Sequence, residues 1–164
     1  DIGTVRTTLE QERTHTGRPY ITADLIEEDR TGTTSLMSSD LMRILGRGAP
    51  ASFVRSLRPE YALGITSRES ADPFLILQST SFDVAFAGML SWEKTLSDDL
   101  APFFQTTNLS AYTYRDALTS NRSIRILRDE RDEERIVYAF VNKNIIIITT
   151  NTEALSRLLD RIRS

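Results

Sequence analysis

The sequence predicts an α+β fold, with a mainly antiparallel sheet of about five to six strands and two principal helices packed on one face of it. Three observations predict this fold. Short apolar runs separated by brief polar turns, at residues 61–79 and 124–149, are typical of strands joined in hairpins. Two segments, after residues 81 and 152, instead place apolar residues three and four apart, as on one face of a helix. At 164 residues, the chain has the size of one domain.

The composition predicts a polar N-terminal arm, or weak helix, over residues 1–18 and a single α+β domain over residues 19–164. The arm is rich in threonine, whose branched side chain disfavours a helix. Its apolar residues, Ile2, Val5 and Leu9, nevertheless have rough helical spacing. The sequence shows no internal repeat with a period of about 20 to 50 residues, so a repeat architecture is excluded.

The first third of the domain predicts a strand, a turn and two short helices. Apolar residues alternate over residues 20–28, which is typical of a half-buried strand. Residues 29–34 contain a glycine and no apolar side chain, so they predict a turn. Ser38 and Ser39 can cap a first short helix. Pro50 suits the first turn of a second one, which Pro59 closes.

A hairpin over residues 61–66 and 73–79 comes next, followed by the longest helical pattern of the chain. Thr80 or Ser81 is a suitable cap for this helix, and Pro102 predicts its end. A glycine inside a helix is unfavourable, so Gly88 predicts that a neighbouring element packs closely there. The buried stripe is expected to contain these residues: Phe82, Ala85, Phe86, Met89, Leu96 and Leu100. Residues 103–122 predict a loop with one short helix.

The last third predicts a three-strand meander and a final helix. Its strands are expected at residues 124–128, 135–141 and 145–149, with a charged turn at residues 129–134. The last strand holds four consecutive isoleucines, which indicates that both of its faces are covered. Thr152 is the expected cap of the helix that follows.

Composition excludes several classes of site. The chain has no cysteine, so disulfides, thiolate metal sites and cysteine nucleophiles are excluded. Its 20 basic and 23 acidic residues are interleaved, and the net charge of −3 disfavours a nucleic-acid binder. No stretch reaches the roughly 18 apolar residues of a membrane helix. Phosphate-binding glycine motifs are also absent from the sequence.

Short motifs give weak support for catalysis. Ser91 and Lys94 match the S-x-x-K pattern of penicillin-binding proteins and β-lactamases, but the companion motifs of that chemistry are missing. His15, the one histidine, lies in a polar segment and is expected at the surface. Adjacent carboxylates at Asp98 and Asp99 and the acidic turn at residues 129–134 lack the spacing of a calcium loop. The sequence therefore predicts no catalytic residue, no cofactor and no metal site.

Aromatic and basic residues give the candidate binding sites. Phe82, Phe86 and Trp92 belong to the densest aromatic region, which predicts either core packing or the lining of a pocket or interface. Arg55, close to a proline and a tyrosine, is a candidate for binding an anion or for an ordinary ion pair.

Two segments resemble a family of uncharacterised bacterial proteins over about residues 50–162. The first segment is Pro73–Leu77 followed by Ser81–Glu93, and the second is Ile124–Asp129 with residues 136–140 and the isoleucine run. The phrase around Gly88, Trp92 and Glu93 is the most specific part, and it adds Glu93 to the candidate ligand or interface residues. The resemblance implies the soluble part of a protein that an upstream transmembrane helix, outside this chain, anchors in the membrane. It carries no assigned activity.

Three hypotheses of function remain. The leading one is a non-catalytic extracytoplasmic interaction or scaffolding module, periplasmic or at the cell surface, that binds a protein partner and contacts the membrane only through the upstream anchor. The first alternative is a small-ligand sensor with a pocket between the sheet and the helix that carries Phe82 and Phe86. The second is a hydrolase that uses serine or carboxylates.

Overall fold

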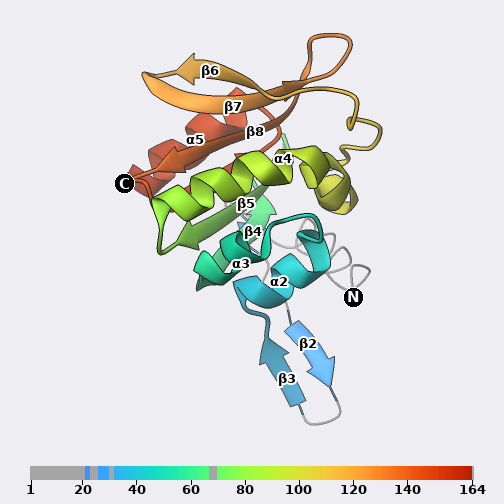
Figure 1. Ribbon diagram of the computed structural model, residues 1–164, viewed down its shortest axis with the longest axis vertical. Helices are drawn as coiled ribbons and strands as arrows, with labels where there is room; N and C mark the ends of the chain where they lie inside the picture. The colour runs from blue at the N-terminus through green and yellow to red at the C-terminus, as the bar shows by residue number, and fades with distance from the viewer. Residues whose placement is uncertain (1–20, 23–25, 30–31, 67–69, 164) are drawn as a thin grey trace.

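An antiparallel sheet of seven strands, in the order β1-β4-β5-β9-β8-β7-β6, organises the described part of the chain (Figure 1). The computed structural model describes residues 21–22, 26–29, 32–66 and 70–163. The helices are α2 (Ser38–Leu45), α3 (Ala51–Ser56), α4 (Phe82–Phe104) and α5 (Thr152–Arg163). The strands are β1 (Ile21–Thr22), β2 (Ile26–Asp29), β3 (Gly32–Ser35), β4 (Leu57–Ile65), β5 (Pro73–Ser79), β6 (Arg115–Thr119), β7 (Arg122–Arg128), β8 (Glu134–Val141) and β9 (Ile145–Thr149). The predicted α+β fold with an antiparallel sheet is confirmed, and the two-residue β1 is the strand beyond the expected five to six.

The two principal helices lie on opposite faces of the sheet, so the prediction that they share one face is wrong. Helix α4, with α2 and α3, packs in one buried cluster that includes Ile146 and Ile148 of β9. Helix α5 packs in a second cluster with Ile147, from the other side of the same strand. Figure 1 shows α4 in front of the sheet and α5 behind it. Because strand side chains alternate between faces, the isoleucine run fills both layers, as its composition predicts.

Helix α4 is 23 residues long and begins where the sequence predicts. The Ser81 hydroxyl accepts a hydrogen bond from the N–H of Val84, as a capping residue does. The predicted end at Pro102 is wrong, because the helix continues to Phe104 and ends at Gln105, whose φ is 53°. A proline removes one backbone donor, and burial of Phe103 and Phe104 in the α4 cluster outweighs that loss.

Gly88 of α4 lies close against the short helix α3. A Cβ placed on Gly88 would lie 2.4 Å from the Cβ of Phe53. This separation is far below van der Waals contact, and Phe53 is fully buried. The prediction that Gly88 marks the close approach of a neighbouring element is therefore confirmed.

The N-terminal third differs from the prediction in three places. Helix α2 is capped at Met37, so the predicted caps Ser38 and Ser39 are its first two residues. Strands β2 and β3 form a separate hairpin in which Glu28 pairs with Thr33, so residues 32–34 belong to a strand rather than to the predicted turn. Strand β4 begins at Leu57, four residues before the expected start at Tyr61, and Pro59 lies within it. The pairing of β4 with β5 shifts register between Leu57 and Tyr61, and such an irregularity accommodates a proline.

The segment expected to be a loop, residues 103–122, contains the edge strand β6 and the start of β7. The β6–β7 turn consists of Ser120 and Asn121, which have φ values of 48° and 59°. Two consecutive residues with positive φ are typical of a tight hairpin turn. Leu118 of β6 is 77% exposed, so this strand lacks the half-buried alternation that would have revealed it.

The predicted N-terminal arm at residues 1–18, with His15, lies outside the described residues. In the part of the chain that the structure describes, no helix has the length and apolar character needed to cross a membrane. The α5 cap is Asn151 rather than Thr152, since the Asn151 side-chain oxygen accepts from the N–H of Ala154 at 2.8 Å.

Candidate functional site

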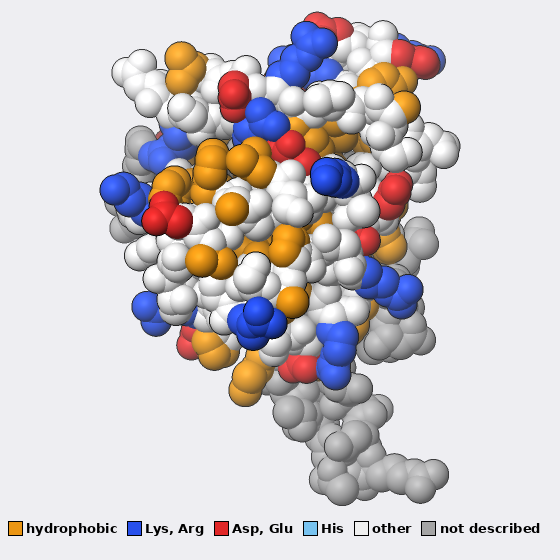
Figure 2. Space-filling view, viewed as in Figure 1, with side chains coloured by type: hydrophobic (Ala, Val, Ile, Leu, Met, Phe, Trp, Pro, Cys, Tyr) orange, Lys and Arg blue, Asp and Glu red, His pale blue; other side chains and the backbone are white. Residues whose placement is uncertain are grey.

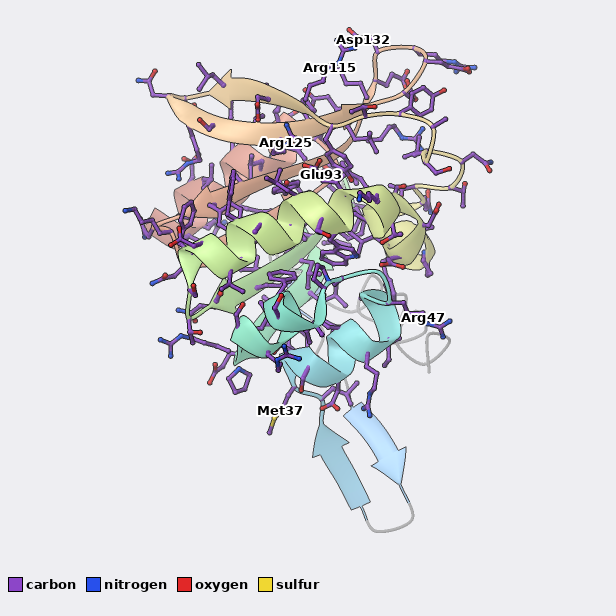
Figure 3. The ribbon with its side chains drawn as sticks, viewed as in Figure 1. Met37, Arg47, Glu93, Arg115, Arg125 and Asp132 are labelled. Carbon is purple, nitrogen blue, oxygen red and sulfur yellow. The ribbon has the colours of Figure 1, made fainter. Side chains whose placement is uncertain are left out.

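A partly buried ion pair joins helix α4 to the sheet. Arg125 of β7 and Tyr138 of β8 are direct cross-strand partners and therefore lie on the same face. Glu93 of α4 contacts both of them, and Figure 3 shows Glu93 and Arg125 pointing toward one another. Arg125 Nε donates to Glu93 Oε1 at 2.8 Å and Nη2 donates to Oε2 at 2.7 Å, while the Tyr138 hydroxyl donates to Oε1 at 2.6 Å. We call Glu93, Arg125 and Tyr138 the Glu93 clamp.

The electrostatics of the clamp favour fixed charges over proton transfer. The hydrogen bonds to Glu93 raise the pKa of Arg125 above its ordinary value, so its guanidinium stays charged. Burial raises the pKa of Tyr138, and the hydrogen bond to Glu93 and its negative charge raise it further, so the hydroxyl keeps its proton. Arg125 and Tyr138 therefore keep their protons near neutral pH, and their hydrogen bonds to Glu93 hold α4 on the sheet.

Tyr114 lies beside the Glu93 clamp. Its ring lies 6.0 Å from that of Tyr138, and 5% of its surface is exposed. Its hydroxyl has no hydrogen-bond partner among the described residues. Burial, followed by the negative charge of Glu93, raises the pKa of Tyr114. Tyr114 and Glu93 line a hollow of about 360 Å³ on one side of the clamp.

A larger groove, of about 960 Å³, lies on the other side of the clamp. We call it the α4 groove. It runs between the first turns of α4 and the strands β7 and β8, and it is open to solvent. Figure 2 shows hydrophobic side chains exposed along the path of α4 on this face. The groove is lined by Phe82, Phe86, Asp116, Ser120, Asn121, Arg122, Ser123, Ile124, Arg125, Tyr138, Ala139, Phe140, Asn142 and Lys143.

Three phenyl rings form the apolar side of the α4 groove. The ring centroids of Phe82 and Phe86 are 5.6 Å apart, and both rings contact Phe140 of β8, at 5.3 and 5.8 Å. Phe86 is 43% exposed, so the prediction that it belongs to the buried stripe of α4 is wrong. A large exposed ring in a groove is a typical anchor point for a ligand or partner. We call these three residues the phenylalanine wall.

Basic side chains dominate the polar side of the groove. Of its four charged residues, Arg122, Arg125 and Lys143 are basic and Asp116 is acidic. Arg125 is already paired with Asp116 at 3.1 Å as well as with Glu93. Arg122 donates from Nη1 to the carbonyl oxygen of Phe140 at 3.0 Å, and its buried Nε has no partner among the described residues.

Trp92, a candidate from the sequence, is completely buried and lies outside the groove. Its indole N–H donates to Asp99 Oδ2 at 2.7 Å, and the same oxygen accepts from the N–H of Gly48 at 2.9 Å. Asp99 therefore ties α4 to the loop between α2 and α3. Trp92 and Asp99 are structural residues, so the structure does not place Trp92 with Phe82 and Phe86.

The remaining candidates lie apart from the groove. Arg55 is exposed on α3 and does not line the groove. Ser91 and Lys94, the S-x-x-K pair, are both exposed on α4 and are not joined by a hydrogen bond in the described structure. Within the described ranges, no three His, Cys, Asp or Glu residues are placed to hold a metal ion.

The acidic turn at residues 129–134 is organised around one carboxylate. Asp129 Oδ1 accepts from the N–H groups of Arg131 and Glu133, at 2.9 and 3.1 Å, and Oδ2 pairs with Arg135 at 3.1 Å. Partial burial acts to raise the pKa of Asp129, but these hydrogen bonds and the guanidinium outweigh it and lower the pKa below its ordinary value. Arg128 and Arg135, rather than Arg131, form the ion pairs that balance the charge of this turn.

The lowered pKa of Asp129 predicts a pH-dependent contribution to stability. A carboxyl group with a lowered folded-state pKa stabilises the fold above its unfolded pKa, about 3.9, and loses that contribution as pH falls through the lower folded value. The difference in unfolding free energy between the wild type and Asp129→Asn is therefore expected to shrink below about pH 4. Urea unfolding at about pH 6 and about pH 3 measures it. Glu130→Gln, at an exposed position of the same turn, is the control, and a difference that stays constant with pH would contradict the prediction.

The sequence did not reveal Arg122, Arg125, Tyr138, Phe140 or Lys143 as site residues. One signal was present: Arg125 stands between Ile124 and Ile126 in an apolar strand, where alternation places it on one face of the sheet. The partner of that charge, 32 residues earlier on α4, follows only from the packing of the helix.

The chain was compared with protein-family models, with curated proteins and with solved structures, and none of them matches it. The resemblance to a bacterial family therefore stays a prediction.

Proposed function

We propose that this domain is a non-catalytic binding module that holds a segment of a protein partner in the α4 groove. The observation that carries the proposal is the phenylalanine wall, in which Phe86 is 43% exposed beside Phe82 and Phe140. Exposed aromatic rings in a concave site supply much of the binding energy at protein interfaces. The Glu93 clamp supports the proposal as well, because it fixes the helix that carries two of the rings. A preformed site loses less conformational entropy when it binds.

Selection of binding peptides tests this proposal. A random linear peptide library displayed on phage is selected on the wild-type domain, and the dissociation constants of the enriched peptides are measured by fluorescence polarisation. Phe86→Ala is expected to weaken binding about thirtyfold, the effect of losing about 2 kcal/mol at a central aromatic contact. Val84→Ala is the matched control, because Val84 is 37% exposed on the same helix but does not line the groove. Peptides that bind both variants as tightly as the wild type would contradict the proposal.

The second candidate function is a small-ligand sensor that uses the same groove. The specific observation in its favour is the volume of about 960 Å³, which lies at the upper end of the range for small-molecule sites. Any ligand that prefers the folded state raises the melting temperature. A thermal-shift screen of metabolites is expected to give a shift that Phe86→Ala abolishes if this function is the correct one.

The proposed setting is outside the cytoplasm, in a bacterial protein anchored in the membrane upstream of this chain. The support for it is the sequence resemblance around Gly88, Trp92 and Glu93. A fusion of the full-length protein to alkaline phosphatase, which is active only outside the cytoplasm, is expected to be active. An inactive fusion of full length would count against this setting.

A further inference from the structure

We propose that the partner segment is an acidic peptide, which places an aromatic or long aliphatic side chain against the phenylalanine wall and a neighbouring carboxylate against Arg122 and Lys143. This inference rests on the proposed function, because it names the chemistry of the segment that the α4 groove would hold. It is carried by the charges of the groove and by their position relative to the three rings.

The groove has the opposite charge to the chain as a whole. The chain has a net charge of −3, whereas three of the four charged residues that line the groove are basic. Arg125 is occupied by Glu93 and Asp116. The cations left for a ligand are therefore Arg122 and Lys143, neither of which has an ion pair with a described residue. Charges of this kind select partners of opposite sign and speed their association.

The backbone of β8 brings these two cations close to the rings. Arg122 Nη1 donates a hydrogen bond to the carbonyl oxygen of Phe140, the residue whose ring contacts both Phe82 and Phe86. Lys143 lies three residues after Phe140, in the turn that joins β8 to β9, where its φ is 64°. A ligand whose apolar side chain packs against the phenylalanine wall is therefore expected to carry its negative charge next to that side chain, on the same or an adjacent residue.

A peptide fits these features better than a nucleic acid does. A phosphate backbone is usually bound through many basic contacts, and the groove offers two cations without an ion pair. A peptide supplies both required groups within a short length, and a planar guanidinium such as that of Arg122 suits a carboxylate. Charge complementarity and the adjacent rings together define the occupant as an acidic segment with an apolar anchor.

The two lysines of the chain provide a matched pair of variants for the test. Lys143 lines the groove, whereas Lys94 is exposed on α4 and does not line it. Peptides selected on the wild type are expected to combine an aromatic or long aliphatic residue with Asp or Glu beside it. Lys143→Glu is expected to weaken their binding about five- to tenfold at low salt, and Lys94→Glu by less than about twofold. Added salt is expected to weaken wild-type binding and to have little effect on Lys143→Glu.

The outcomes separate this inference from the function on which it rests. Peptides that depend on Phe86 but contain no excess of acidic residues, or that bind Lys143→Glu as tightly as the wild type, would overturn the inference and leave the proposed function standing. A selection without peptides that depend on Phe86 would overturn both. Sedimentation that reveals a dimer lost in Phe86→Ala would identify a second copy of the chain as the occupant and overturn the acidic peptide. A metabolite that alone gives a Phe86-dependent thermal shift would overturn it too.

Discussion

Replacing Glu93 by alanine is expected to lower the free energy of unfolding by about 1 to 3 kcal/mol, because a buried tyrosine hydroxyl and a partly buried guanidinium lose their acceptor. The change leaves the Arg125 guanidinium and the Tyr138 hydroxyl without their shared acceptor. Tyr138 is 1% exposed, so water cannot readily replace the lost carboxylate. Denaturant unfolding measures the effect, and the fluorescence of Trp92, the one tryptophan of the chain, reports it.

Asp116→Ala is the matched control for this prediction. Asp116 pairs with the same arginine, but its side chain is 86% exposed. Its removal is expected to change the unfolding free energy by less than about 1 kcal/mol, as for other surface pairs. Equal losses for the two variants would show that burial does not distinguish the two carboxylates, and the role of the clamp in fixing α4 would have to be abandoned.

Gly88→Val is expected to lower the free energy of unfolding by about 2 to 3 kcal/mol through overpacking. The added Cβ would lie 2.4 Å from the Cβ of Phe53. That atom cannot rotate away as the tip of a flexible side chain can, so α3 has to move. Valine has a better helix propensity than glycine, and propensity alone would therefore predict a gain in stability. The sign of the change, measured by denaturant unfolding, decides between packing and propensity.

Ala87→Val introduces the same side chain one residue earlier, at an exposed position of α4. Here only helix propensity changes, and the loss is expected to stay within about 0.7 kcal/mol. A loss of stability for Gly88→Val no larger than that for Ala87→Val would contradict the prediction, because it would show that α3 moves to admit the added side chain at no cost in unfolding free energy.

The sequence predicts those elements whose apolar pattern follows directly from burial. Strand β9 and helix α5 are of this kind, because consecutive isoleucines and a three-and-four spacing each correspond to one environment. Strand β6 was missed because an edge strand with exposed Arg115, Asp116 and Leu118 has no alternation to detect. The end of α4 was missed because burial of Phe103 and Phe104 lies in the tertiary structure and overrides the local signal of a proline.

The candidate site was predicted in part. The aromatic density of α4 pointed to Phe82 and Phe86, which the groove brings together, and the resemblance added Glu93, which holds the helix beside it. Trp92 was placed in the same group, although its indole is buried outside the groove and donates to Asp99. Phe140 and the cations of β7 and β8 were not predicted. Their proximity depends on how the helix lies over the sheet, and that is a long-range property of the fold.

The position of β5 in the sheet has a consequence for the order of folding. This strand pairs on one side with β4, which precedes it closely, and on the other with β9, where Phe74 lies opposite Thr149. During synthesis, one edge of β5 therefore stays open until nearly the whole chain has emerged. Contacts between such distant residues slow folding, and an open apolar edge invites association with other chains. The domain is thus expected to fold as a unit after its last strand is made, and chains that end before β9 are expected to aggregate.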